Sequence, residues 1–313
     1  MTETAHPIVW LHHAGQHLGL VPSLGGSVAA WQADRPEGPL DLWRPWDGVT
    51  PDLYQLASFP MVPWSNRISG GGFTHGGRFH PMQNNRAGEP YPIHGDGWLQ
   101  PWVLTQPADD TLVMTLRSQG FQGNPHDYEA VQTFRLVDGG LDQRVEVRHL
   151  GEQPLPYGIG VHPWFPRTPA TRISAPVQGV WLCGDDPMPV EHTTLYPPGW
   201  NLNEGVSAHG TLIDNGYTGW GGSARIEWPE RGLQLTATMP DFERDGGIAQ
   251  HYCLIYRPPV GPAFCFEPIT QPIDAFHLAG QPGLRVLSQG EACALHVQWR
   301  LGPLQSPAPA SAG

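Results

Sequence analysis

Short apolar runs separated by turns rich in glycine and proline recur along the whole chain. Within residues 141–150, Val145 and Val147 alternate with charged side chains. This period of two places one face of a strand in a core and the other in water. A glycine turn joins this segment to the preceding run, 128–137, so the two segments are predicted to form an antiparallel hairpin.

The same pattern predicts two short strands within 21–31, joined by Gly25-Gly26, and a strand pair within 72–79. Single strands are predicted at 112–117, 224–228, 233–238, 252–257, 263–267, 284–287 and 293–299. No segment has the periodicity of a long helix. Many short strands with frequent turns indicate an all-β sandwich or barrel, and the length favours a large antiparallel β-sandwich. No repeat or linker divides residues 1–305, which are predicted to be a single domain, whereas the composition of 306–313 predicts a disordered tail.

Charge and composition exclude several classes of function. All 17 cations are arginines and the net charge is −12. An acidic surface repels nucleic acid, and the absence of lysine removes Schiff-base chemistry and the Walker-type phosphate loop. Neither a signal peptide nor a long apolar segment is seen, so we expect a soluble cytoplasmic protein without membrane contact.

The four cysteines are far apart and show neither a CxxC pair nor a zinc-type spacing with histidine. They are expected to be reduced thiols. Cys253, Cys265 and Cys293 lie within apolar strand-like runs, which indicates core packing.

The first candidate catalytic residue is Glu267. It follows the apolar run 263–266, and Pro268 is expected to end that strand one residue later, which would put the carboxylate at a strand mouth. Partial desolvation would make it more basic and suit it to act as a general base. The alternative is a solvated glutamate at a strand end.

The second candidate is His162, at the end of the small and apolar run 157–161. Pro163 is expected to interrupt the strand, and Trp164 and Phe165 supply flat apolar surfaces on which a sugar ring could stack. The alternative is a histidine whose hydrogen bonds are satisfied within the core.

Further candidate residues lie in loops. Two nearby prolines place Asn66 and Arg67 on an irregular but ordered segment, where Arg67 could also be a surface ion-pair partner. His94 precedes Gly95, and a glycine there could leave room for a ligand. Asp214 begins an Asp-Asn-Gly sequence that could simply be a tight turn.

Five of these stretches occur in an order that resembles the aldose 1-epimerase (galactose mutarotase) family. They are Ser65-Asn66-Arg67-Ile68, His94-Gly95, Gly160 to Phe165, Asp214 to Tyr217, and Phe266-Glu267-Pro268 through Asp274-Ala275-Phe276-His277. Together they span about two-thirds of the chain. The resemblance implies a large antiparallel β-sandwich of the galactose mutarotase type.

The resemblance also implies roles for individual residues. Glu267 would remove the proton of the anomeric hydroxyl and His162 would protonate the ring oxygen. Binding of the sugar would fall to Asn66, Arg67, His94, Asp214, Trp164 and Gln250. The implied partner is a small sugar bound by a monomer or homodimer, and no cofactor or metal is required.

Two positions depart from the family pattern. Trp164 stands where an aromatic hydroxyl is common, and Asp96 replaces a second glycine after His94. Asp96 could meet a substrate hydroxyl or face water. Both departures bear on which sugar is preferred.

Three other functions remain open at this point. A hexose-6-phosphate 1-epimerase would need extra cations, for which Arg78 and Arg86 are available. A non-catalytic carbohydrate-binding or sensing sandwich would use the aromatic residues alone. A glycosidase would use Asp214 and Glu267 as paired carboxylates.

Overall fold

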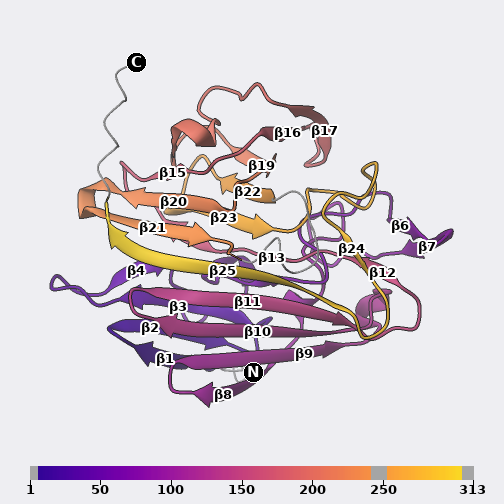
Figure 1. Cartoon of the computed structure of the whole chain (residues 1–313), viewed down its shortest axis with the longest axis horizontal. Coiled ribbons are helices and arrows are strands. Elements are labelled where there is room, and N and C mark those ends of the chain that lie inside the picture. The colour runs from indigo at the N-terminus through magenta and orange to yellow at the C-terminus, as the bar shows by residue number, and fades with distance from the viewer. Residues whose placement is uncertain (1–5, 241–251, 305–313) are drawn as a thin grey trace.

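The computed structural model describes residues 6–240 and 252–304, and within these ranges it contains 25 strands, five short 3₁₀ helices and no α-helix (Figure 1). The prediction of an all-β fold is therefore confirmed. The 3₁₀ helices are Leu53–Gln55, Gly97–Leu99, Phe121–Gly123, Leu202–Glu204 and Pro229–Arg231. None of the described helices is long and apolar enough to cross a membrane. The predicted tail, 306–313, lies outside the described residues.

The larger of the two main sheets has nine strands, which cross the molecule side by side in Figure 1. Their spatial order is β18 (Val206–Ser207), β15 (Arg172–Ser174), β20 (Ser223–Trp228), β21 (Leu233–Thr238), β25 (Ala292–Pro303), β11 (Gly140–His149), β10 (Tyr128–Val137), β9 (Thr111–Ser118) and β8 (Val103–Ala108). β10 and β11 pair antiparallel along their whole length, as the alternating sequence predicts.

The second main sheet has eight strands. Seven follow the order β17 (Pro189–Thr193), β16 (Gly179–Cys183), β19 (Ile213–Thr218), β22 (Tyr252–Arg257), β23 (Ala263–Ile269), β13 (Gly160–Val161) and β5 (Pro60–Met61). The eighth, β14 (Trp164–Pro166), also pairs with β23. All these pairings are antiparallel.

Three smaller sheets complete the fold. A four-stranded sheet contains β1 (Val9–His13), β2 (Gln16–Val21), β3 (Ser27–Ala33) and β4 (Leu40–Trp43). The hairpin of β6 (Gly72–His75) and β7 (Arg78–Pro81) forms one two-stranded sheet, and the distant segments β12 (Leu155–Tyr157) and β24 (Arg285–Leu287) form the other.

Aromatic side chains join the sheets in the core. Trp299 of β25 lies 5.8 Å from Phe165 of β14 and 5.6 Å from Trp43 of β4, measured between ring centroids. Phe266 of β23 makes an edge contact at 5.3 Å with Trp220. Residues of all three larger sheets thus belong to one buried apolar cluster, as a sandwich requires.

β23 differs from the sequence prediction. It continues through Pro268 to Ile269, so Glu267 lies inside the strand and not at its mouth. Thr270 donates its N–H to Ile159, and the alternation along a strand turns Pro268 to that same side. On that side of β23 the ladder of backbone hydrogen bonds is interrupted between β13 and β14. The strand therefore tolerates Pro268, which has no N–H to donate.

Phe266 provides a test of the core. We expect Phe266→Ala to lower the free energy of unfolding by about 3–5 kcal/mol, because the removed ring leaves a cavity between the sheets. Denaturant titration measures this change. The matched control is Phe79→Ala, whose side chain is 51% exposed and should alter stability little; equal losses in both variants would contradict the packing described above.

Candidate active site

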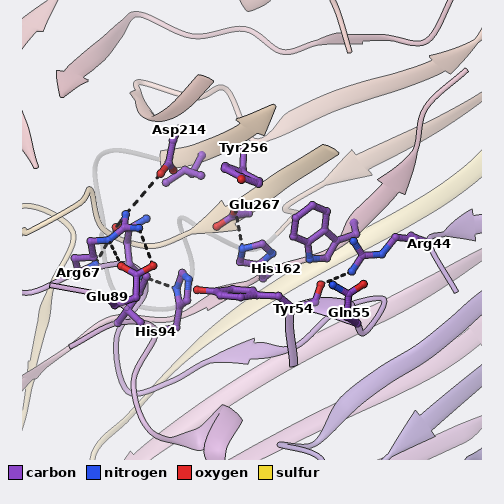
Figure 2. A pocket seen from close by; sticks show the side chains of 14 residues that line it. Arg44, Tyr54, Gln55, Arg67, Glu89, His94, His162, Asp214, Tyr256 and Glu267 are labelled. Carbon is purple, nitrogen blue, oxygen red and sulfur yellow. Dashed lines mark hydrogen bonds and ion pairs between the residues drawn. The ribbon is translucent and has the colours of Figure 1, made fainter. Parts of the chain in front are cut away.

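A pocket of about 290 Å³ opens onto the eight-stranded sheet (Figure 2). This volume is near the lower end of the range for small-ligand sites, roughly 300–1,000 Å³. Its lining residues are Arg44, Tyr54, Gln55, Asn66, Arg67, Glu89, Ile93, His94, His162, Trp164, Asp214, Leu254, Tyr256 and Glu267. Five predicted sugar-binding residues and both predicted catalytic residues are brought together here, while Gln250 lies outside the described residues.

The floor of the pocket consists of two adjacent rows of side chains that cross the sheet. The register places Asp214, Tyr256, Cys265 and Trp164 in one row. The second row lies two residues away along each strand and consists of Gly216, Leu254, Glu267 and His162. Residues opposite one another in an antiparallel sheet point to the same face, so the pairing itself assembles the floor.

His162 lies directly opposite Glu267. Gly160 is opposite Ile269 and Trp164 is opposite Cys265, and His162 falls midway between these two pairs. The chain bends away from β23 at this point, because the N–H of His162 donates to Phe59 O at 3.1 Å. The Phe59 ring stacks on the imidazole with a centroid distance of 4.5 Å, which fixes its plane.

The two side chains form a close and buried pair. His162 Nε2 is 3.3 Å from Glu267 Oε1, and the residues are 5% and 1% exposed. Neither His162 Nδ1 nor Glu267 Oε1 makes a hydrogen bond to the described residues, because the 3.3 Å contact between Oε1 and Nε2 is an ion-pair distance without hydrogen-bond geometry. Buried polar atoms are normally paired, and unpaired ones at a pocket floor point to a bound ligand.

The surroundings disfavour charge on both members of the pair. Burial raises the pKa of Glu267 well above its usual range, and the nearby Asp214 adds to this while Arg67 opposes it. Burial lowers the pKa of His162 to about 3, with a further contribution from Arg44. Glu267 is therefore more basic than a free glutamate, as predicted, and burial favours the neutral form of both groups.

One wall of the pocket carries a charged cluster around Arg67. Its Nε is 2.9 Å from Glu89 Oε2, and its Nη1 is 3.7 Å from Asp214 Oδ2. Asp214 lies within β19, so the alternative prediction of a tight turn at this position is wrong. Strand pairing with Tyr256 on β22 holds the segment extended. Glu89 could not be predicted, because nothing in its loop sequence distinguishes it from a surface glutamate.

His94 is fixed by the neighbouring loop. The N–H of Asn66 donates to His94 Nδ1 at 3.1 Å, which leaves the proton of the neutral ring on Nε2. Burial, with nearby His162 and Arg67, lowers the pKa of His94 well below its usual value. His94 is thus a neutral N–H donor at the pocket wall.

Gly95 serves the backbone and not a ligand. Its φ is +71°, and a Cβ at this position would lie 1.8 Å from Val62 O. The expectation that this glycine leaves room for a substrate is therefore wrong, because the Val62 segment occupies that space.

Trp164 lines the pocket, but its ring is already in contact with several neighbours. The guanidinium of Arg44 lies 4.2 Å from the ring centroid, and the Tyr256 ring meets it edge-on at 5.6 Å. Neither Arg44 nor Tyr256 was predicted from the sequence to belong to the site. Tyr256 could have been found from the strand period, because it lies on the same face of β22 as Leu254.

Asp96 points away from the pocket, so both expectations for it are wrong. It accepts hydrogen bonds from the hydroxyl of Tyr128 and from Asn124 Nδ2 in a buried network. Burial raises its pKa to about 6. The second departure from the family pattern thus changes the support of the His94 loop and not the ligand contacts.

The segment after β23 holds the wall in place. Gln271 Nε2 donates to Ser65 O at 2.8 Å, and the N–H of Asp274 donates to Arg67 O at 3.1 Å. The carboxylate of Asp274 also accepts hydrogen bonds from Ser69. One continuous stretch of chain therefore carries Glu267 and positions the Arg67 loop.

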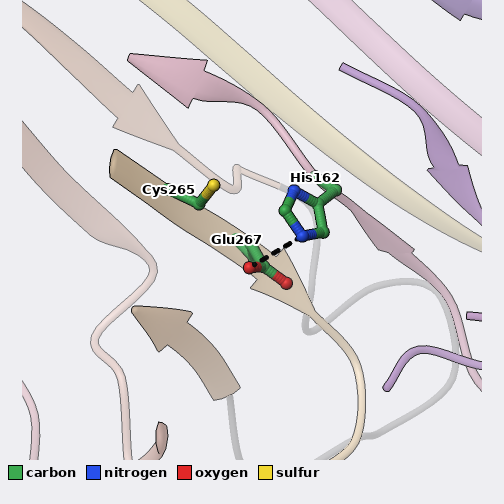
Figure 3. A group of neighbouring side chains, drawn as sticks. All are labelled: His162, Cys265 and Glu267. Carbon is green, nitrogen blue, oxygen red and sulfur yellow. Dashed lines mark ion pairs between the residues drawn. The ribbon is translucent and has the colours of Figure 1, made fainter. Parts of the chain in front are cut away.

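A metal ion could be held by three neighbouring side chains, those of His162, Cys265 and Glu267 (Figure 3). One ligand atom from each lies within 4.8 Å of the others, and all three residues are buried. A thiol, an imidazole and a carboxylate suit Zn²⁺. Spacing in the sequence gave no sign of this set, because its members come from β23 and from the junction between β13 and β14.

The comparisons with known proteins agree with this architecture. The aldose 1-epimerase family pattern matches residues 9–243. The Escherichia coli K12 protein YphB, which is uncharacterized, is 31% identical over 263 residues, covering 80% of this chain and 86% of YphB. A crystal structure of a candidate aldose 1-epimerase from Escherichia coli K12 has a TM-score of 0.85 at 28% identity, covering 95% of this chain and 99% of the other.

A galactose mutarotase-like protein from Clostridium acetobutylicum shares the fold, with a TM-score of 0.81 at 17% identity over 97% of each chain. The sandwich and its polar pocket define a protein of the galactose mutarotase-like class. Within that class, the chain belongs to the aldose 1-epimerase family.

Asp96 predicts a pH dependence of stability. A carboxyl whose pKa rises on folding stabilises the fold below about pH 4, and this contribution is lost as the pH rises through about 6. Between these limits wild type should lose up to about 3 kcal/mol of unfolding free energy relative to Asp96→Asn. Urea titrations of both proteins from pH 4 to 8 measure the difference, and parallel curves would contradict the assignment.

The His162–Cys265–Glu267 set predicts a metal effect. We expect Zn²⁺ to compete with any ligand of the pocket, and Cys265→Ser to weaken Zn²⁺ binding by roughly tenfold or more, because one ligand is lost. Cd²⁺ provides an independent readout, since the ultraviolet absorption of a cadmium–thiolate bond should appear in wild type and be absent in Cys265→Ser. Equal Zn²⁺ affinity in both proteins would rule out the thiolate ligand.

Proposed function

We propose that the protein is an aldose 1-epimerase that interconverts the α and β anomers of a free aldose. The observation that carries the proposal is the buried pair of His162 and Glu267, with unpartnered atoms on both residues, at the floor of a sugar-sized pocket. An acid and a base held this close can move one proton onto a bound molecule while removing another.

In the proposed reaction, Glu267 takes the proton of the anomeric hydroxyl while His162 delivers a proton to the ring oxygen. The C1–O5 bond breaks and an open-chain aldehyde forms. Rotation about C1–C2 presents the other face of the aldehyde, and ring closure returns both protons with the roles exchanged. The proton count of the pair is the same before and after the cycle.

The protonation state that burial favours fits this cycle. The neutral pair that burial favours is the state in which Glu267 and His162 are left after ring opening. Ring closure from either face can start from it. The charged form needed for ring opening contains the same single proton, shifted from Glu267 to His162, and sugar hydroxyls that donate to the carboxylate would stabilise it.

The remaining pocket residues bind and orient the sugar in this proposal. Arg67 and the Nε2–H of His94 donate to hydroxyl oxygens, whereas Asp214 accepts from hydroxyl groups. Asn66 orients its neighbours, because its Oδ1 accepts from the N–H of Arg67 and its own N–H holds His94. Trp164 contributes an apolar surface, and the family resemblance adds Gln250 to the sugar-binding set.

The arginines first considered for a sugar phosphate do not support that alternative. Arg78 is exposed on the β6–β7 hairpin. Arg86 forms an ion pair with Asp52 at 3.2 Å and stacks on Tyr54. Neither lines the pocket described here.

The proposal is tested by anomer exchange of free aldoses, followed by polarimetry or by NMR exchange spectroscopy. Wild type should accelerate the exchange, and Glu267→Gln and His162→Ala should each reduce that acceleration about 100- to 10,000-fold. Glu37→Gln and His209→Ala change the same residue types at exposed positions and should keep the wild-type rate.

Other results would favour the alternatives. Full activity in Glu267→Gln would remove the acid–base role and leave a sugar-binding sandwich. Cleavage of a chromogenic glycoside by wild type would indicate a glycosidase. No acceleration with any hexose or pentose, neutral or acidic, would overturn the proposed reaction.

A further inference from the structure

Arg44 is the one cation lining the described pocket that has no carboxylate partner. Arg67 is paired with Glu89 and lies near Asp214. Within residues 6–240 and 252–304, Arg44 has no acidic group at ion-pair distance. Its Nη2 donates to the backbone oxygens of Tyr54 and of Leu56, the latter at 3.0 Å.

The contacts of Arg44 are with neutral groups, and Asp52, whose charge acts on Arg44 from farther away, is itself paired with Arg86. One face of the guanidinium lies on the Trp164 ring, its Nε is buried without a partner, and Nη1 makes no hydrogen bond to the described residues. Burial accordingly lowers the pKa of Arg44. A chain with 29 acidic residues and 17 arginines has ample carboxylates to pair with each cation, yet none is present here. Such a site is suited to an anion brought by the ligand.

The position of Arg44 indicates which part of a sugar it would meet. In Figure 2 the cluster of Arg67, Glu89 and Asp214 lies at one end of the pocket and Arg44 at the other, with His162 between them. The His162 ring is 5.6 Å from that of Trp164, and the Arg44 guanidinium lies 4.2 Å from the Trp164 centroid.

This geometry orients the sugar once the proposed function is granted. His162 serves the ring oxygen, and the Arg67 end binds ring hydroxyls. The remaining neighbour of the ring oxygen is C5, which bears the exocyclic carbon of a hexopyranose. That exocyclic group then points past His162 and along Trp164 toward Arg44.

We infer that the pocket takes an aldose with an acidic group on its exocyclic carbon, and that Arg44 binds this group. The inference rests on the proposed function, because the roles of His162 and Glu267 set the orientation. Of the two guanidinium nitrogens without a hydrogen bond, Nε is buried, which leaves Nη1 to bind the acidic group. The small pocket favours a compact planar carboxylate over a phosphate ester. The substrate class is therefore a hexuronic acid.

The test compares anomer exchange of galacturonate and glucuronate with that of galactose, glucose and glucose 6-phosphate. Wild type should show a kcat/KM at least about tenfold higher for one of the uronates than for its neutral counterpart, as expected for a hydrogen bond to a charged group. Arg44→Gln should lower kcat/KM for that uronate more than for its neutral counterpart and so remove the preference, whereas Arg44→Lys should retain part of it.

Three other results would overturn the inference about Arg44, or part of it. Equal kcat/KM for uronates and neutral sugars in wild type overturns the inference while the epimerase proposal stands, and this comparison does not depend on whether a variant folds. A higher value for glucose 6-phosphate overturns the choice of carboxylate and assigns Arg44 to a phosphate. A parallel loss for all sugars in Arg44→Gln gives Arg44 a purely structural role as the support of the Tyr54 loop.

If no aldose is epimerised, the proposed function fails and the anion site is judged by binding alone. Calorimetric titration of wild type and Arg44→Lys with galacturonate and glucuronate then decides it. Affinity that decreases with ionic strength supports an anion site, and no affinity overturns it.

Discussion

The antiparallel register of β23 is the constraint on which the rest of the site depends. This strand pairs with β22 on one side and with β13 and β14 on the other, so its residues fix what stands opposite them. Glu267 meets His162 because the chain is paired on either side of that position. Strand pairing, and not a flexible loop, sets the geometry of the acid–base pair, and so little reorganisation is needed when a ligand enters.

The same burial that holds the pair also determines its charge state. Glu267 and His162 are almost fully buried, and desolvation makes the ionised form of each unfavourable. In the reaction proposed above, the neutral pair is the state from which the ring closes, so burial favours that half of the cycle.

Strand positions could be predicted from the sequence, because a period of two is a local signal. The candidate site residues lie next to interrupting prolines and glycines, but it was the resemblance to the aldose 1-epimerase family that grouped them into one site. The run through Glu267 was shortened wrongly at Pro268, since the neighbouring gap in the ladder is a tertiary feature. Asp214 resembled a turn because Asn-Gly is a local signal that strand pairing overrides. The places of Arg44, Glu89 and Cys265 in and beside the pocket arise only through contacts between distant segments, and no local pattern identifies them.

The period of two also places core-packing residues and pocket residues on opposite faces of the same strands. Along β23, Phe264 and Phe266 belong to the buried cluster, whereas Cys265 and Glu267 alternate with them on the pocket floor. Along β22, Cys253 and Ile255 face the core, while Leu254 and Tyr256 face the pocket. Mutations on the pocket face can thus change ligand preference without altering the core. The sheet gives this fold a route by which related proteins can diverge in substrate while keeping the same sandwich.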